Sequence, residues 1–164
     1  AETVHLDVLL VEDNPGDVRL TRKAFEDAGL VNNLHEVNDG VAAMEYLRKE
    51  GEYTDVERPD MVLLDLNLPR KSGEEVLSEI KTDPDLKRIP VVILTSSDAE
   101  EDMIKTYNQH ANAYLKKPVK FRGFLDVVQR ARDGEAATTA ELARDLGVGH
   151  RVGGQVQVKS VSRS

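Results

Sequence analysis

Acidic side chains follow two short apolar runs of this sequence, and carboxylates in such positions can build a reactive site. Glu12 and Asp13 come directly after the run LDVLLV, and Asp65 ends the run MVLLD. The run VVILT ends on Thr95, and Lys117 follows the run AYLK. If these runs are parallel strands of one sheet, their carboxyl ends meet at one edge, where the five side chains converge.

Crowded carboxylates repel one another, and they stay ionised only if a cation lies among them. Oxygen ligands with no cysteine or histidine nearby favour a hard cation, so we expect Mg²⁺. Asp13 and Asp65 are the expected direct ligands, and Glu12 is expected to act through water. Asn67 follows Asp65 in the turn LNLP and is expected to offer its backbone carbonyl.

A divalent metal, an ammonium and a hydroxyl are the groups needed to transfer a phosphoryl group to a carboxylate. Such a transfer depends mainly on positioning and on neutralising the charge of the phosphoryl oxygens. Asp65 would be the nucleophile and would form an aspartyl phosphate. Each residue alone has an ordinary structural explanation, since Asp often ends strands and Thr95 could cap a helix. Their joint placement at one sheet edge favours the functional interpretation.

The elements that must position these residues alternate between strand and helix along the chain. The strands are expected at about residues 6–12, 33–38, 60–65, 91–97 and 113–116, and the helices at about 15–28, 39–51, 72–82, 98–110 and 121–128. Asn14 and Asp98 are expected to cap their helices. Alternation of this kind requires parallel pairing with right-handed crossovers. We therefore predict an α/β fold, a flavodoxin-like (βα)5 three-layer sandwich with the strand order 2-1-3-4-5.

Several motifs resemble a known family. The segments VLLVEDN, LLDLNLP, LTSS and YLKKPV are similar to the response-regulator receiver domain of two-component signalling, over about residues 6–132. The longer segments VEDNPGDVRLTRKAF, LNLPRKSG and DPDLKRIPVV resemble single-domain regulators that are paired with phytochrome-type histidine kinases.

The resemblance implies roles for the same residues. Asp65 becomes the phosphoacceptor, and Thr95 becomes the switch hydroxyl that turns toward the phosphate. Tyr114 matches the switch aromatic that rotates inward when Thr95 moves. The bond between Lys117 and Pro118 matches a step that is commonly cis in the family.

The resemblance also implies partners. It predicts a cytoplasmic phosphoprotein that receives its phosphoryl group from a histidine kinase, with a phytochrome-like kinase as the candidate. The protein then signals to a downstream protein or passes the group along a phosphorelay. Such a protein is not a conventional turnover enzyme, although it can dephosphorylate itself. The face formed by the fourth helix, fifth strand and fifth helix is a candidate homodimer surface.

Composition excludes several other classes. The chain has 164 residues, no cysteine and a net charge of −8, so disulfides, thiolate nucleophiles and cysteine-based zinc sites are excluded and nucleic-acid binding is disfavoured. No apolar run approaches the roughly 18 residues that a membrane helix needs. The four histidines show no ligand spacing.

The composition changes near residue 133, which predicts a receiver domain over 1–133 and a tail over 134–164 without a separate output domain. The tail is expected to hold a short helix followed by a strand-like or disordered end. TTAELARDLGVG resembles the start of a helix-turn-helix, which leaves tail-mediated transcription control as an alternative output. Gly153 and Gly154 disfavour a recognition helix there.

A haloacid-dehalogenase-type phosphatase is the alternative of a different class, because it also uses an aspartate nucleophile at the end of a strand. That family requires a second aspartate two positions later. Asn67 occupies this position here, which disfavours the phosphatase.

Overall fold

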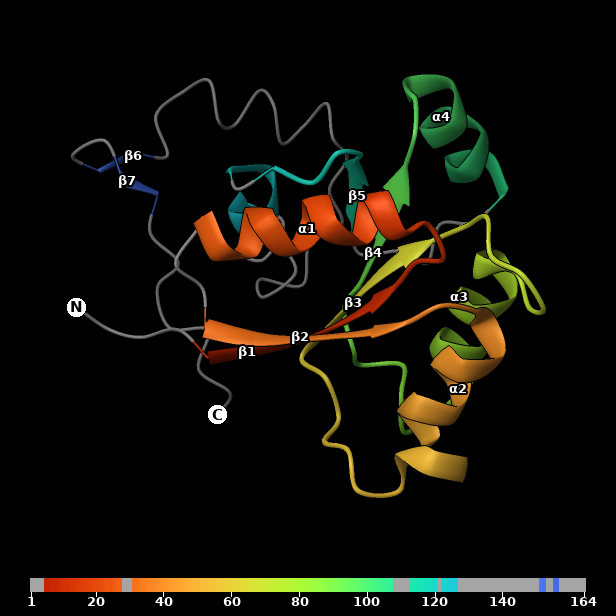
Figure 1. The fold of residues 1–164 in the computed structure, drawn as a ribbon. Coiled ribbons are helices and arrows are strands. Elements are labelled where there is room, and N and C mark those ends of the chain that lie inside the picture. Colours follow the sequence, from red (N-terminus) through yellow and green to blue (C-terminus); the bar gives the residue numbers. More distant parts are fainter. Residues whose placement is uncertain are drawn as a thin grey trace.

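The computed structural model describes residues 5–27, 31–107, 113–120, 122–126, 151–152 and 155–156. Its centre is a sheet of five parallel strands in the order β2-β1-β3-β4-β5 (Figure 1). The strands are β1 (His5–Val11), β2 (Val31–Val37), β3 (Met61–Asp65), β4 (Val91–Thr95) and β5 (Ala113–Lys116). The predicted strand order is confirmed, so the carboxyl ends of all five strands lie at one edge.

Helices cover both faces of the sheet (Figure 1). They are α1 (Pro15–Asp27), α2 (Gly40–Arg48), α3 (Gly73–Thr82) and α4 (Asp98–Tyr107), and a short 3-10 helix η1 (Gly51–Tyr53) follows α2. Residues 122–126 are helical as well. The layer of α2 and α3 lies on one face, and α1 with residues 122–126 lies on the other, which confirms the three-layer arrangement.

The hydrophobic core divides into two clusters, one on each face of the sheet. Residues of β1 alternate between them, with Leu9 in the cluster under α2 and α3 and Leu10 in the cluster under α1. Every residue of β3 and β4 is buried. This is the burial expected of parallel strands that are covered on both faces, and it holds the site-bearing strand ends rigidly.

Side-chain caps fix where the helices begin. The Asn14 side chain accepts a hydrogen bond from the N–H of Asp17, as predicted for the start of α1. Ser72 and Glu75 form a reciprocal capping box at α3. The cap predicted at Asp98 is wrong, because the Ser97 hydroxyl accepts the N–H of Glu100 at 3.1 Å and Asp98 is the first residue of α4.

Two further predictions lie wholly or partly outside the described residues. The fourth helix is described to Tyr107 rather than to residue 110, and the short helix of the tail is not described. β6 (Arg151–Val152) and β7 (Gln155–Val156) form a separate antiparallel pair. The division into 1–133 and 134–164 therefore stays a prediction.

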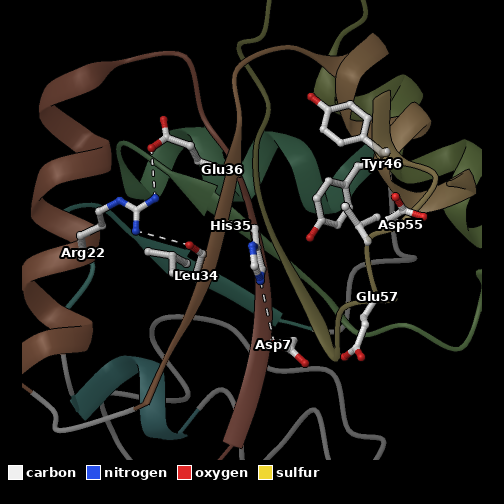
Figure 2. Close-up of a pocket in the computed structure, with 10 residues that line it drawn as sticks. Asp7, Arg22, Leu34, His35, Glu36, Tyr46, Asp55 and Glu57 are labelled. Carbon is white, nitrogen blue, oxygen red and sulfur yellow. Dashed lines mark hydrogen bonds and ion pairs between the residues drawn. The ribbon is translucent and has the colours of Figure 1, made fainter. Parts of the chain in front are cut away.

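A side chain from α1 lies against β2, the strand at one edge of the sheet. The Arg22 guanidinium donates to the carbonyl of Leu34 at 3.3 Å and to the Glu36 carboxylate at 3.1 Å (Figure 2). A hollow of about 610 Å³ lies beside these contacts, lined also by His35, Tyr46 and several acids. The guanidinium of Arg22, which comes from α1, contacts the edge strand β2, and a charged group against an edge strand disfavours pairing with other chains. None of the residues lining this hollow belongs to the predicted site.

Candidate functional site

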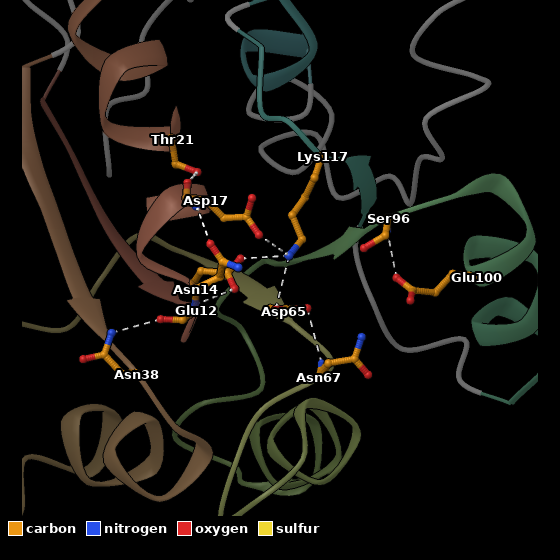
Figure 3. Close-up of polar contacts among 10 residues, drawn as sticks. All are labelled: Glu12, Asn14, Asp17, Thr21, Asn38, Asp65, Asn67, Ser96, Glu100 and Lys117. Carbon is orange, nitrogen blue, oxygen red and sulfur yellow. Dashed lines mark hydrogen bonds and ion pairs between the residues drawn. The ribbon is translucent and has the colours of Figure 1, made fainter. Parts of the chain in front are cut away.

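The predicted polar side chains converge at the carboxyl edge of the sheet. Lys117 follows β5 and points its ammonium between the ends of β1 and β3 (Figure 3). Its Nζ lies 3.0 Å from Oε1 of Glu12 and 3.3 Å from Oδ2 of Asp65. Residues separated by more than 50 positions in the sequence thus meet in one ion-pair cluster.

Three carboxylates form a ligand set beside this ammonium. Oxygens of Glu12, Asp13 and Asp65 lie within 4.8 Å of one another. Glu12 and Asp65 are buried, whereas Asp13 is exposed to solvent. An all-oxygen set with one open side suits a hard, partly hydrated cation, and the donor chemistry therefore fits Mg²⁺. The fold therefore brings these three acids together, as the sequence predicted.

The turn after β3 keeps the Asp65 carboxylate in place. The N–H of Asn67 donates to Oδ1 of Asp65 at 3.3 Å. The N–H of Gly73 donates to the carbonyl of Leu66 at 3.0 Å, which brings the start of α3 against the strand end. A Cβ on Gly73 would collide with the carbonyl oxygen of Asp65, so only glycine allows this approach. The turn that begins with Asn67 therefore orients the carboxylate.

The electrostatics of the site depend on burial. Burial, followed by a hydrogen bond with Asp65 and charge repulsion from Asp65, raises the pKa of Glu12 to about 7, and Lys117 opposes part of this increase. Burial also acts to lower the pKa of Lys117, but its hydrogen bonds to Glu12 and Asp17 and the charge of Asp65 outweigh this and raise it. Lys117 is therefore a permanent cation at neutral pH, while Glu12 is close to its titration point.

Lys117 is held by its backbone as well as by its charge. Its N–H donates to the carbonyl of Thr95 at 2.7 Å, which ties the ends of β4 and β5 together. The peptide bond between Lys117 and Pro118 is cis, as the resemblance implied.

Thr95 has no part in capping α4. Its side chain is fully buried, and its Oγ1 has no hydrogen-bond partner in the part of the chain that the structure describes. A buried hydroxyl without a partner is costly, so this group gains if an acceptor arrives at the site.

Tyr114 lies inward in the structure. Its side chain is buried and packs in the core cluster shared with α2 and α3. Burial and the charge of Glu101 raise the pKa of its hydroxyl. The ring is therefore already in the inward position that the resemblance associates with the switch.

The sequence did not point to a further carboxylate, that of Asp17. Its Oδ2 lies 3.0 Å from Nζ of Lys117, as close as Glu12 (Figure 3). The available signal was the segment Asn14-Pro15-Gly16-Asp17, in which the cap at Asn14 fixes Asp17 in the first turn of α1, directly after the acidic pair.

Comparison with known proteins finds one matching family model and several similar proteins. Residues 8–129 match the family model described as the response regulator receiver domain. The response regulator Rcp1 of a Synechocystis species is 48% identical over 122 residues, which cover 74% of this chain and 83% of that protein. A crystal structure of the Mn²⁺-bound form of Rcp1 is 50% identical, with a TM-score of 0.62, and the match covers 68% of this chain and 81% of that one.

Two other solved structures are similar. The bacteriophytochrome response regulator AtBRR is 42% identical with a TM-score of 0.73, and the match covers 78% of this chain and 93% of that chain. The phosphorylated cyanobacterial phytochrome response regulator RcpA is 49% identical with a TM-score of 0.63, and the match covers 72% of this chain and 84% of that chain.

Proposed function

The chain belongs to the response regulator receiver domain family, and on this premise we propose that Asp65 accepts a phosphoryl group from a histidine kinase with Mg²⁺ bound beside it. The observation that carries the proposal is the cluster in which Lys117 contacts Asp65 and Glu12 next to the three-carboxylate ligand set. The metal would be held by Asp13 and Asp65, by Glu12 through water and by the backbone carbonyl of Asn67. Relatives with a bound Mn²⁺ and with a phosphorylated site support this assignment.

In the proposed transfer, an oxygen of Asp65 attacks the phosphorus of a phosphohistidine. A P–O bond forms as the P–N bond breaks, and the imidazole leaves with the electron pair and takes up a proton. Bound Mg²⁺ supplies positive charge to the phosphoryl oxygens. Lys117 stays within reach of the same oxygens, and the N–H of Asn67 holds the other end of the carboxylate in place.

Thr95 and Tyr114 are proposed to convert the phosphorylation into a signal. The unpaired hydroxyl of Thr95 gains an acceptor when a phosphoryl oxygen arrives, so its side chain turns toward Asp65. Because Tyr114 lies on β5, which pairs with the strand that carries Thr95, this movement changes the surface of α4, β5 and residues 122–126. We propose this surface as the contact for a downstream protein or for a second copy of the chain.

The partner is proposed to be a phytochrome-type histidine kinase, because RcpA and AtBRR are both described as phytochrome response regulators. We also propose that the protein acts in the cytoplasm, dephosphorylates itself and has no separate output domain in residues 134–164. No helix in the described part of the chain is long and apolar enough to span a bilayer.

Phosphotransfer from a phytochrome-type kinase carrying labelled phosphate tests the acceptor. Label should appear on the wild-type chain and be absent from Asp65→Asn. Asp55→Asn is a matched control, because it removes the same charge from an exposed loop position outside the site. Transfer that survives Asp65→Asn contradicts the assignment.

Beryllofluoride titration followed by NMR tests the switch separately. Amide signals of α4 and of Tyr114 should shift along with those of the loops beside Asp65. If only the loops respond, the switch is wrong while the phosphoacceptor stands.

The phosphatase alternative has little support. A second carboxylate is needed two positions after the nucleophile, and Asn67 provides an amide there. Turnover of a generic phosphomonoester by the wild-type chain would revive it.

A further inference from the structure

Asp17 contacts the ammonium of Lys117 from α1, a helix that supplies no other side chain to the proposed reaction. It lies in the first turn of α1, and its Oδ2 is 3.0 Å from Nζ of Lys117, 100 positions away in the sequence. Figure 3 shows its carboxylate on the side of Lys117 that faces α1. Lys117 therefore has three acidic partners: Glu12, Asp17 and Asp65.

The backbone of Asp17 is fixed on both sides. Its N–H donates to Oδ1 of Asn14 at 3.0 Å, and its carbonyl accepts the hydroxyl of Thr21 at 2.8 Å. Thr21 is itself buried in the face of α1 that packs on the sheet. A carboxylate on such a rigid turn holds its partner at a defined position.

Two of the three partners of Lys117 are also members of the metal ligand set. Glu12 and Asp65 belong to the group whose oxygens lie within 4.8 Å, and Asp17 does not. A divalent cation in that group and the ammonium of Lys117 would repel each other and would compete for the same two carboxylates. Asp17 is then the one of these acidic partners that Lys117 does not share with the metal.

We infer that Asp17 is a positioning residue that holds Lys117 and neutralises its charge, so that Mg²⁺ occupies the ligand set while the ammonium stays beside Asp65. This inference rests on the proposed function, because it assigns the ligand set to Mg²⁺. Loss of the Asp17 charge weakens Mg²⁺ binding in two ways with the same sign. First, a negative charge near the metal ligands is lost. Second, the positive charge of Lys117 is no longer neutralised by Asp17, so Lys117 binds Glu12 and Asp65 more strongly in competition with Mg²⁺.

Calorimetric titration of the full chain with Mg²⁺ tests the inference. Asp17→Asn should raise the dissociation constant for Mg²⁺ by about fivefold, the scale of coupling between charges in contact. Asp27→Asn removes the same charge from the exposed end of the same helix, and it should leave the constant within about twofold of wild type. Asp17→Glu keeps the charge and should restore most of the affinity.

A double-mutant cycle with Lys117→Met separates positioning from a general effect of charge or of helix stability. If Asp17 acts through Lys117, the effect of Asp17→Asn shrinks to about twofold or less in the Lys117→Met background. Far-UV circular dichroism on each variant confirms that it is folded. An equal loss of affinity in both backgrounds overturns the inference, and so does unchanged affinity in Asp17→Asn.

The same titration distinguishes the inference from the proposal beneath it. If the wild-type chain takes up no Mg²⁺, the proposed function fails. If it binds Mg²⁺ and becomes phosphorylated while Asp17→Asn behaves like wild type, only the role of Asp17 fails.

Discussion

The buried carboxyl of Glu12 should make the stability of the metal-free protein depend on pH. Its side chain is 1% exposed, and burial together with Asp65 raises its pKa to about 7 from an ordinary value of 4.5. The folded state therefore holds a proton on Glu12 over a range in which the unfolded chain has lost it. Below about pH 4.5 both states are protonated, and stability is at its full value for this group.

The magnitude follows from the two pKa values. As pH rises from 4.5 to about 7, the folded state binds more protons than the unfolded state, so the free energy of unfolding falls by up to about 1.4 kcal/mol for each pH unit. Over this interval of about 2.5 pH units, the loss is at most about 3–4 kcal/mol. Relaxation around a charged pair with Lys117 reduces it, and we expect about 2 kcal/mol between pH 5 and pH 8.

Urea unfolding in a chelator, followed by far-UV circular dichroism at about pH 5 and about pH 8, measures this effect. Glu12→Gln has no titrating group at this position, so the wild type should lose about 2 kcal/mol relative to that variant on going to the higher pH. Saturating Mg²⁺ should flatten the difference, because a cation favours the ionised carboxylate. If the wild type and Glu12→Gln keep the same difference at both pH values, the raised pKa is wrong.

Three other substitutions test how the fold positions the site. Gly73→Ala should cost about 1–3 kcal/mol in urea unfolding and weaken Mg²⁺ binding, because the added Cβ meets the carbonyl of Asp65; unchanged binding would contradict the close packing of this turn. Ser72→Ala should cost about 1 kcal/mol by removing the cap of α3, with Mg²⁺ affinity unaffected. Phe124→Ala should lower the free energy of unfolding by about 3–5 kcal/mol and speed hydrogen exchange in α1, because the ring centroids of Phe124 and Phe25 lie 4.4 Å apart. Unchanged slow exchange in α1 would argue against this packing.

The strand order and the position of the site were predictable from local patterns. Short apolar runs of four to seven residues that alternate with amphipathic segments permit few topologies once parallel pairing and right-handed crossovers are required. Because those runs end on Glu12, Asp65 and Thr95, the edge where the side chains meet followed from the topology. The caps were less certain, since Ser97 and Asp98 are adjacent residues with similar capping propensity and only the backbone geometry chooses between them.

The sequence by itself determined which elements form, in which order they pair and which carboxylates gather at one edge, because these depend on periodicity and chain connectivity. Only the tertiary structure decided that Asp17 contacts Lys117, that burial raises the pKa of Glu12 and that the hydroxyl of Thr95 is buried without a partner among the described residues. These properties arise from distances and burial set by several elements together. Local sequence carries no record of how much solvent remains around a side chain once distant segments have packed against it.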